Sequence, residues 1–118
     1  MPYKKIMQAL VERTPRAIGA ILLDWEGEAV QEFCYCEPYE IRFVAAHQGI
    51  ILSRIRELHK NGQGGAVEEV VVSSSDGCLI IGCINQDYSL MLSVERICPM
   101  GLALHHFRDT LTVLRKEI

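Results

Sequence analysis

EEVVVSSSDGCLIIGCINQDYSLMLSV, which runs from Glu68 to Val94, predicts three strands joined by two tight turns. The strands are expected at Ala66–Ser73, Cys78–Ile84 and Tyr88–Val94, with SSDG and NQD as the turns. The strand at Cys78–Ile84 is apolar on both of its alternating sides, which indicates a central strand that is covered on both faces. This stretch contains almost no side chain that is suited to catalysis, so its role is structural.

The segments on either side of this stretch complete an α+β fold. Upstream, AIGAILLDWEGEAVQEFCYC predicts a hairpin of Ala17–Asp24 and Glu28–Cys36, with its turn at DWEG, where Gly27 is free to take a positive φ. Apolar residues at helical spacing predict three helices, at Tyr3–Arg13, Tyr39–Lys60 and Met100–Lys116. The order α-β-β-α-β-β-β-α predicts a five-stranded antiparallel sheet with helices on both faces.

The helix predicted at Tyr39–Lys60 has two apolar sides, whereas a surface helix needs only one. The main stripe, which would cover the sheet, consists of Ile41, Val44, Ala45, Gln48, Ile51, Leu52, Ile55 and Leu58. A second side carries Phe43, His47, Ile50 and Arg54, with Ala46 beside them. Because one subunit can bury only one of these sides against its own sheet, we interpret the second side as covered by something else, which points to protein association.

Composition argues against several classes of protein. The chain has 118 residues, enough for a single domain spanning residues 1–118. Its net charge is −3 and its Lys and Arg are scattered, which argues against nucleic-acid binding. No apolar stretch is long enough to span a bilayer and MPYKKIMQAL lacks the apolar core of a signal peptide, so we expect a cytoplasmic protein without a membrane partner. No nucleotide-binding motif occurs, and we expect no cofactor.

Few residues are candidates for chemistry, and we predict no catalytic residue. Cys34 and Cys36 share a face of a predicted strand and could hold a metal, but their spacing differs from that of structural zinc sites, and buried free thiols are the simpler interpretation. His105 and Asp109 are one helical turn apart and could pair, or could be ordinary solvated side chains. The turn at DWEG presents Trp25 either to a binding partner or to the edge of the sheet.

Several stretches of the chain resemble the roadblock/dynein light chain family, in the same order and over nearly the whole length, from about Tyr3 to Arg115. These stretches are TPRAIGAILLDWEGEAV, VAAHQGIIL, EEVVVSSSDGCLIIGCINQDYSLMLSV and CPMGLALHHFRDTL. Arg16 departs from the pattern, because many members have Gly after the residue equivalent to Pro15. The departure affects a loop and leaves the expected roadblock, profilin-like fold intact.

The resemblance implies a dimer of two identical or two different chains. The central helices of the two subunits would pack together and their third strands would pair edge to edge, which removes an exposed sheet edge. The helix residues facing the partner would be Phe43, His47, Ile50 and Arg54. The strand residues pairing with the partner would be Val70, Val71, Val72 and Ser73.

The resemblance also implies a function: a regulator or scaffold that binds a Ras-like small GTPase, similar to prokaryotic gliding-motility regulators. Stimulated GTP hydrolysis would need either an arginine supplied to the GTPase or a grip that stabilises the catalytic arrangement of the GTPase itself. The arginines available for the first mechanism are Arg16, Arg42, Arg54 and Arg108.

Two other classes of protein remain open from the residues alone. A sensor domain of similar α/β/α architecture would enclose a small molecule, with space left by Gly82 in the middle of a strand. Alternatively, Gly82 lets a helix approach the sheet closely. A redox or metal protein would use Cys34 and Cys36.

Overall fold

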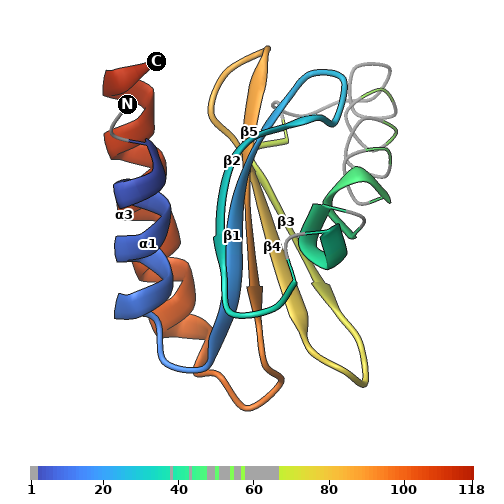
Figure 1. Ribbon diagram of the computed structural model, residues 1–118, viewed down its shortest axis with the longest axis vertical. Coiled ribbons are helices and arrows are strands. Elements are labelled where there is room, and N and C mark those ends of the chain that lie inside the picture. Colours follow the sequence, from blue (N-terminus) through green and yellow to red (C-terminus); the bar gives the residue numbers. More distant parts are fainter. Residues whose placement is uncertain are drawn as a thin grey trace.

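The computed structural model describes residues 3–37, 39–42, 44–47, 50, 54, 57 and 67–118. The elements with continuous bounds are α1 (Tyr3–Arg13), β1 (Ala17–Asp24), β2 (Ala29–Cys34), β3 (Glu69–Ser73), β4 (Cys78–Cys83), β5 (Tyr88–Val94) and α3 (Met100–Glu117). Residues 39–42, 44–47, 50, 54 and 57 are helical, lie within the range predicted at Tyr39–Lys60, and make up the middle helix. The predicted α+β class and its five-stranded antiparallel sheet are confirmed (Figure 1).

The five strands lie in the order β2-β1-β5-β4-β3. Each neighbouring pair is antiparallel, and β1 pairs with β5 along its whole length, from Ala17 opposite Val94 to Asp24 opposite Tyr88. The strand predicted at Cys78–Ile84 has a neighbour on each side, although β5 is the middle strand. The two edges of the sheet are therefore β2 and β3, which are the strands on either side of the middle helix in the sequence.

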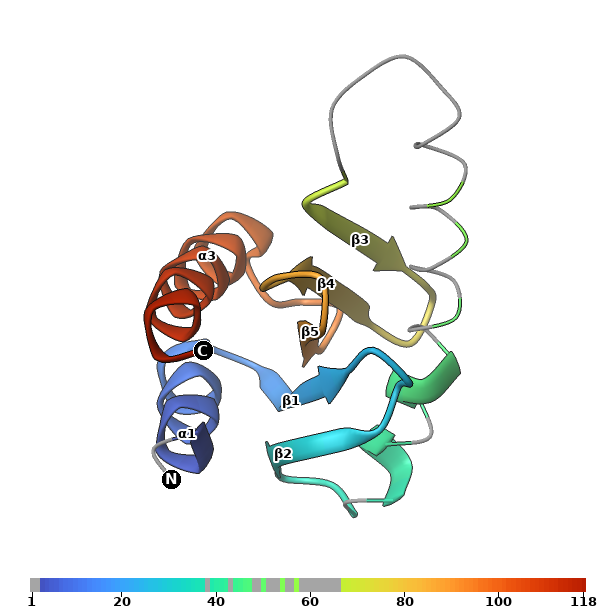
Figure 2. The same cartoon turned by 90° about the horizontal axis from the view of Figure 1, so that it is seen from above.

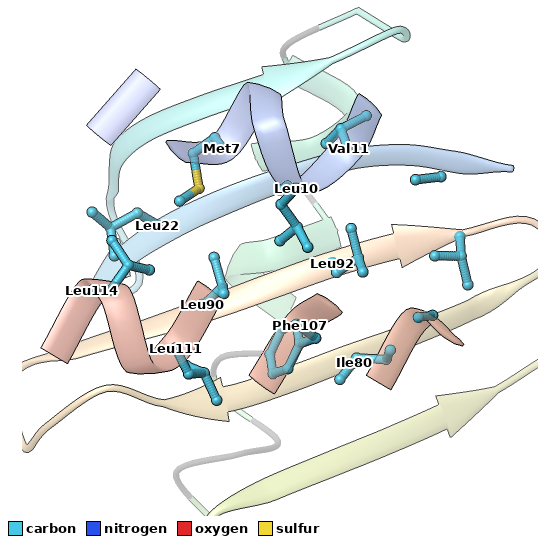
Figure 3. Packing of buried hydrophobic residues seen from close by; sticks show 14 of the residues in the cluster. Met7, Leu10, Val11, Leu22, Ile80, Leu90, Leu92, Phe107, Leu111 and Leu114 are labelled. Carbon is cyan, nitrogen blue, oxygen red and sulfur yellow. The ribbon is translucent and has the colours of Figure 1, made fainter. Parts of the chain in front are cut away.

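Helices α1 and α3 lie side by side on one face of the sheet, and the middle helix lies on the other (Figure 2). The core between the sheet and the α1–α3 layer is built from residues that alternate along each strand and recur at helical spacing (Figure 3). Phe107 of α3 is fully buried there, and its truncation to Ala would cost about 3–5 kcal/mol. The predicted apolar stripes of both helices supply this core: Met7, Leu10, Val11, Ala103, Phe107, Leu111 and Leu114 are buried.

The opposite face of the sheet is covered by the middle helix through Ile41 and Ala45, which are buried against Ile21, Ile81 and Met91. Close approach is possible because Gly19 of β1 lies under this helix. A Cβ on Gly19 would stand 2.6 Å from Cδ1 of Ile41 and 2.5 Å from Cβ of Cys34. Val44, predicted in the same stripe, is instead 37% exposed at the margin of the contact.

β1, β5, the end of β3 and the start of β4 have the predicted bounds, whereas both ends of β2, the start of β3 and the end of β4, at Cys83, differ by one to three residues. β2 begins after Glu28 because the carboxylate of Asp24 accepts hydrogen bonds from the N–H groups of Glu26 (2.9 Å) and Glu28 (3.0 Å), which holds both in the turn. Gly27 takes the predicted positive φ, at 86°. β2 also ends early, at Cys34, and β3 begins late, at Glu69, while Ala66 is outside the described residues.

Candidate protein-interaction site

The outer edge of β3 carries backbone groups that no other described strand pairs with. The N–H of Cys83 donates to Glu68 (3.0 Å) and the N–H of Ser74 donates to Gly77 (2.8 Å), which fixes the alternation along the β3–β4 pair. Residues 70 and 72 therefore bond to β4, while residues 69, 71 and 73 direct their N–H and C=O groups outward. The side chain of Val71 is 41% exposed on this edge. An unpaired edge with apolar side chains is a template for another strand.

The second predicted side of the middle helix is exposed wherever the structure describes it. Ile50 is 59% exposed, and Ala46, His47 and Arg54 are exposed as well. Phe43 lies outside the described residues. Ile50 is thus a large apolar side chain with more than half of its surface exposed, on a helix whose Ile41 and Ala45 are buried against the sheet.

The β3 edge and the middle helix belong to the same side of the molecule. Val70 of β3 packs into the cluster that contains Ile41 and Ala45 of the middle helix. Val70 and the described start of the middle helix thus pack together on the same face of the sheet. Trp25 is elsewhere: it is 71% exposed at the turn between β1 and β2, at the opposite edge of the sheet.

An ion pair fixes the beginning of β3 to α3. The guanidinium of Arg108 contacts both carboxylate oxygens of Glu69, with Nε 3.2 Å from Oε2 and the second nitrogen on Oε1. The hydrogen bond from Arg108 lowers the pKa of Glu69, although partial burial opposes the shift, and Glu69 raises the pKa of Arg108. The pair keeps the carboxylate directed toward α3.

A cleft of about 380 Å³ lies between β3 and α3 and is lined by Glu68, Glu69, Arg108, Leu111, Thr112 and Arg115. Its cations already have partners. Arg108 holds Glu69, and Arg115 donates to the backbone carbonyls of Cys83 (2.8 Å) and Ile84 (3.3 Å). These contacts hold the sheet against α3. Both arginines therefore donate hydrogen bonds to groups of the same chain.

The small-molecule alternative finds little support around Gly82. A Cβ on Gly82 would be 2.7 Å from Phe107, so the glycine lets α3 approach and leaves no space for a ligand. A pocket of about 150 Å³ lies between the middle helix and the ends of β1 and β5. That volume is below the 300–1,000 Å³ or so of typical ligand pockets.

Cys34 and His105, which were candidates for chemistry, each contact a residue close by in the sequence. The thiol of Cys34 donates to the carbonyl of Cys36 (3.1 Å), and burial followed by this neighbour raises the pKa of Cys34 to about 11. His105 Nε2 lies 3.5 Å from Asp109 Oδ2, and both side chains are largely exposed on α3. Within residues 3–37 and 67–118 and the described part of the middle helix, no three metal-ligating side chains converge. In the same residues, neither length nor hydropathy equips any helix to span a bilayer.

Several solved structures have the same arrangement of helices and strands as this chain. The Roadblock/LC7 domain from Streptomyces avermitilis matches with a TM-score of 0.87 over 97% of this chain and 95% of that chain, at 22% sequence identity. The chain has the roadblock fold. The gliding protein MglB from Thermus thermophilus matches with a TM-score of 0.84 at 16% identity, over 95% of this chain and 84% of that one. A structure of MglB with a tetrameric arrangement gives the same values.

No protein-family model matches the sequence, and no curated protein sequence is detectably similar to it. The roadblock fold predicted from short stretches of sequence is nevertheless confirmed by the structure. Sequence reasoning did not find the ion pairs that position the site. Glu69 and Arg108 are 39 residues apart, and Glu32 and Arg42 are 10 apart, so no local pattern connects them.

Proposed function

We propose that this roadblock chain is a dimeric regulator or scaffold that binds a Ras-like small GTPase. The observation that carries the proposal is the exposed side of the middle helix, which includes Ile50, on the same face of the sheet as Val70 of the outward-facing strand β3. Two copies related by a two-fold axis would bury both features in one self-complementary contact. The tetrameric arrangement of an MglB with this fold supports association between copies.

Glu69 marks the start of the edge that would pair, and the four residues after it carry no charge. Val70, Val71, Val72 and Ser73 therefore place no like charges opposite each other when two β3 strands run antiparallel. The ion pair with Arg108 keeps the Glu69 carboxylate beside α3 in the same subunit. An uncharged edge of this kind is compatible with pairing to an identical strand.

The GTPase partner is inferred from the resemblance to gliding-motility regulators and from the fold that this chain shares with the gliding protein MglB. The regulator would have no catalytic residues of its own. Three of its four candidate arginines already contact carboxylates: Arg16 with Glu95, Arg42 with Glu32 and Arg108 with Glu69. We therefore favour a grip that stabilises the catalytic arrangement of the GTPase over an arginine inserted into its active site.

The dimer is tested by light scattering on matched variants. Val71→Pro removes an outward N–H and leaves the bonds to β4, so it should give monomers, whereas Val71→Ala should stay dimeric. Ile50→Glu should also give monomers, and Val113→Glu, on exposed α3, should not. Dimers in both Val71→Pro and Ile50→Glu would mean that the interface lies elsewhere.

The GTPase function is tested by single-turnover GTP hydrolysis with Ras-like small GTPases from the same organism. Faster hydrolysis with the wild-type chain identifies an activator, and complex formation without a change in rate identifies a scaffold. Because the proposed mechanism uses no inserted arginine, Arg54→Ala should keep most of the stimulation of GTP hydrolysis. Ile50→Glu, which is expected to disrupt the dimer, should lose it. Absence of both binding and stimulation would reject a GTPase partner.

A further inference from the structure

The second edge of the sheet differs from β3 in its charge. Residues 24–40 contain Asp24, Glu26, Glu28, Glu32, Glu37 and Glu40 but no Lys or Arg. The chain has fifteen Asp and Glu and twelve Lys and Arg, so the nine acids elsewhere are outnumbered by all twelve bases. The acidic segment contains β2, an edge strand, and although Arg42 pairs with Glu32, the other five acids of the segment have no basic partner among the described residues.

The outer edge of β2 carries backbone groups that no other strand of the described residues pairs with. The N–H of Tyr35 donates to Ile18 (2.9 Å), which places residues 31 and 33 in the bonded positions opposite β1. The backbone groups of Glu32 and Cys34 consequently point away from the sheet. The N–H of Glu32 is occupied only by the adjacent side chain, Gln31 Oε1, at 3.1 Å, a local bond that the carbonyl of another strand can replace.

Large apolar side chains flank this edge. Trp25 lies at the turn before β2, Val30 lies within β2, and Tyr35 follows it, and all three are exposed, Tyr35 by 66%. Trp and Tyr supply much of the binding energy at protein interfaces. A strand edge that only had to avoid aggregation would be covered by charged side chains without such aromatic residues.

The charges decide which strand fits this edge. Glu26 and Glu28 near one end and Glu37 near the other are exposed, so a second copy of β2 would bring like charges together. Lys or Arg side chains of a different chain would meet these carboxylates and could also stack on Trp25 and Tyr35. The edge is thus unsuited to self-pairing and complementary to a basic strand.

We propose that the β2 edge binds an extended, Lys- or Arg-containing segment of a partner protein, which adds to the sheet as a further strand. Backbone hydrogen bonds to Glu32 and Cys34 would hold the segment, and its basic side chains would select this edge over β3. The site is independent of the proposed dimer, because β2 and β3 are opposite edges of the sheet (Figure 2).

The test uses the peptide KVKVKVKV, labelled with fluorescein, and the wild-type chain. At low ionic strength we expect saturable binding that weakens at about 0.5 M salt, with the largest amide shifts at Glu32 and Cys34 in NMR spectra. The acidic peptide EVEVEVEV should not bind. A peptide with the KVKVKVKV sequence but N-methylated at every residue keeps the charge and loses its N–H donors, so it should bind at least about tenfold more weakly.

Two variants of the protein complete the test. Glu32→Ala and Glu32→Pro both lose the ion pair with Arg42, but only Pro also removes the outward N–H, so Pro should bind KVKVKVKV about tenfold more weakly than Ala. No binding of KVKVKVKV, equal binding of the N-methylated peptide, or amide shifts centred outside residues 28–36 would each overturn the proposal. If Glu32→Pro does not fold, the comparison of KVKVKVKV with its N-methylated form on the wild-type chain still tests the proposal.

Discussion

Gly82 of β4 lies directly beneath the ring of Phe107: a Cβ at this position would stand 2.7 Å from Cε2 and 3.0 Å from Cζ of that ring. Leu111, one turn further along α3, would be 2.9 Å away. The glycine therefore sets how closely α3 packs on the sheet. Its place in the middle of a strand has a packing reason, and the space that a small ligand would need is filled by Phe107.

Gly82→Ala should destabilise the protein by about 1–3 kcal/mol, because the added methyl group forces the Phe107 ring and the backbone of α3 to move. Gly101→Ala is the matched control, since a Cβ there meets nothing within 4 Å and Ala favours a helix by up to about 1 kcal/mol. Urea unfolding at one fixed protein concentration measures both. Equal free energies of unfolding for Gly82→Ala and Gly101→Ala would show that the close packing of α3 does not depend on the glycine at position 82.

Arg16 is held in the left-handed region, with φ at 66°, and it contacts Glu95 twice. Its Nε is 2.6 Å from Oε2 of Glu95, and its carbonyl accepts the N–H of Glu95 at 2.9 Å. This backbone geometry explains why many roadblock sequences have Gly at the equivalent position.

We expect Arg16→Gly to be more stable than Arg16→Ala by about 0.5–1 kcal/mol, because both lose the ion pair but only Ala keeps the cost of a left-handed φ. Thermal and urea unfolding of the two variants provide the comparison, with the wild type as the reference for the ion pair. A more stable Ala variant would contradict a left-handed φ at this position.

The Glu69–Arg108 pair should make stability depend on pH in a defined direction. The lowered pKa of Glu69 means that the contribution of the pair is complete above the ordinary value of 4.5 and is lost as the pH falls through the lowered value. Arg108→Gln should return the pKa of Glu69 toward 4.5 and reduce the loss of stability in acid.

Carboxyl NMR titration of Glu69, together with urea unfolding at neutral and acidic pH, measures both effects. Arg96→Gln is the control, because Arg96 donates to the carbonyl of Ser74 instead of Glu69. An unchanged titration of Glu69 in Arg108→Gln would disprove the assignment.

Cys34 should react slowly with alkylating reagents in the folded protein. With a pKa of about 11 in place of 9.0, its thiolate fraction at pH 8 falls roughly a hundredfold, chiefly because of burial. Iodoacetamide labelling followed by tandem mass spectrometry gives the rate at Cys34 in native buffer and in urea. Similar rates in the two conditions would show that the thiol is not protected.

The order and type of the elements could be predicted from the sequence because their signals are local. Helical spacing of apolar residues located α1 and α3, and the turn residues around Gly27 and Asp76 located the hairpins. The order of strands in the sheet could not be predicted in this way, because β1 and β5 pair although they are far apart in the sequence. No local pattern shows that this pairing leaves β2 and β3 as the edges.

For the candidate site, the sequence predicted a side of the middle helix that its own sheet does not cover, and Ile50 and Arg54 are exposed, while their contact with a partner stays a prediction. Val44 illustrates where such reasoning fails. A helical wheel placed Val44 with Ile41 and Ala45, yet among these three described residues only Ile41 and Ala45 are buried, and Val44 falls at the margin of the contact. The wheel gives the direction of a side chain but not the width of the surface that covers it. The acidic residues around β2 could be read from the sequence, but their significance depends on β2 being an edge strand, which only the structure shows.

The hydroxyl of Tyr3 in α1 lies 3.5 Å from the carbonyl of Glu117 in α3, so the first and last helices meet at their outer ends (Figure 1). A fluorescent protein joined at either end would therefore emerge from the α1–α3 layer, away from the middle helix. A few glycines would be enough to join the two ends into a circular permutant, opened instead at the turn between β3 and β4. Such a permutant would place a reporter within a few residues of the outward edge of β3.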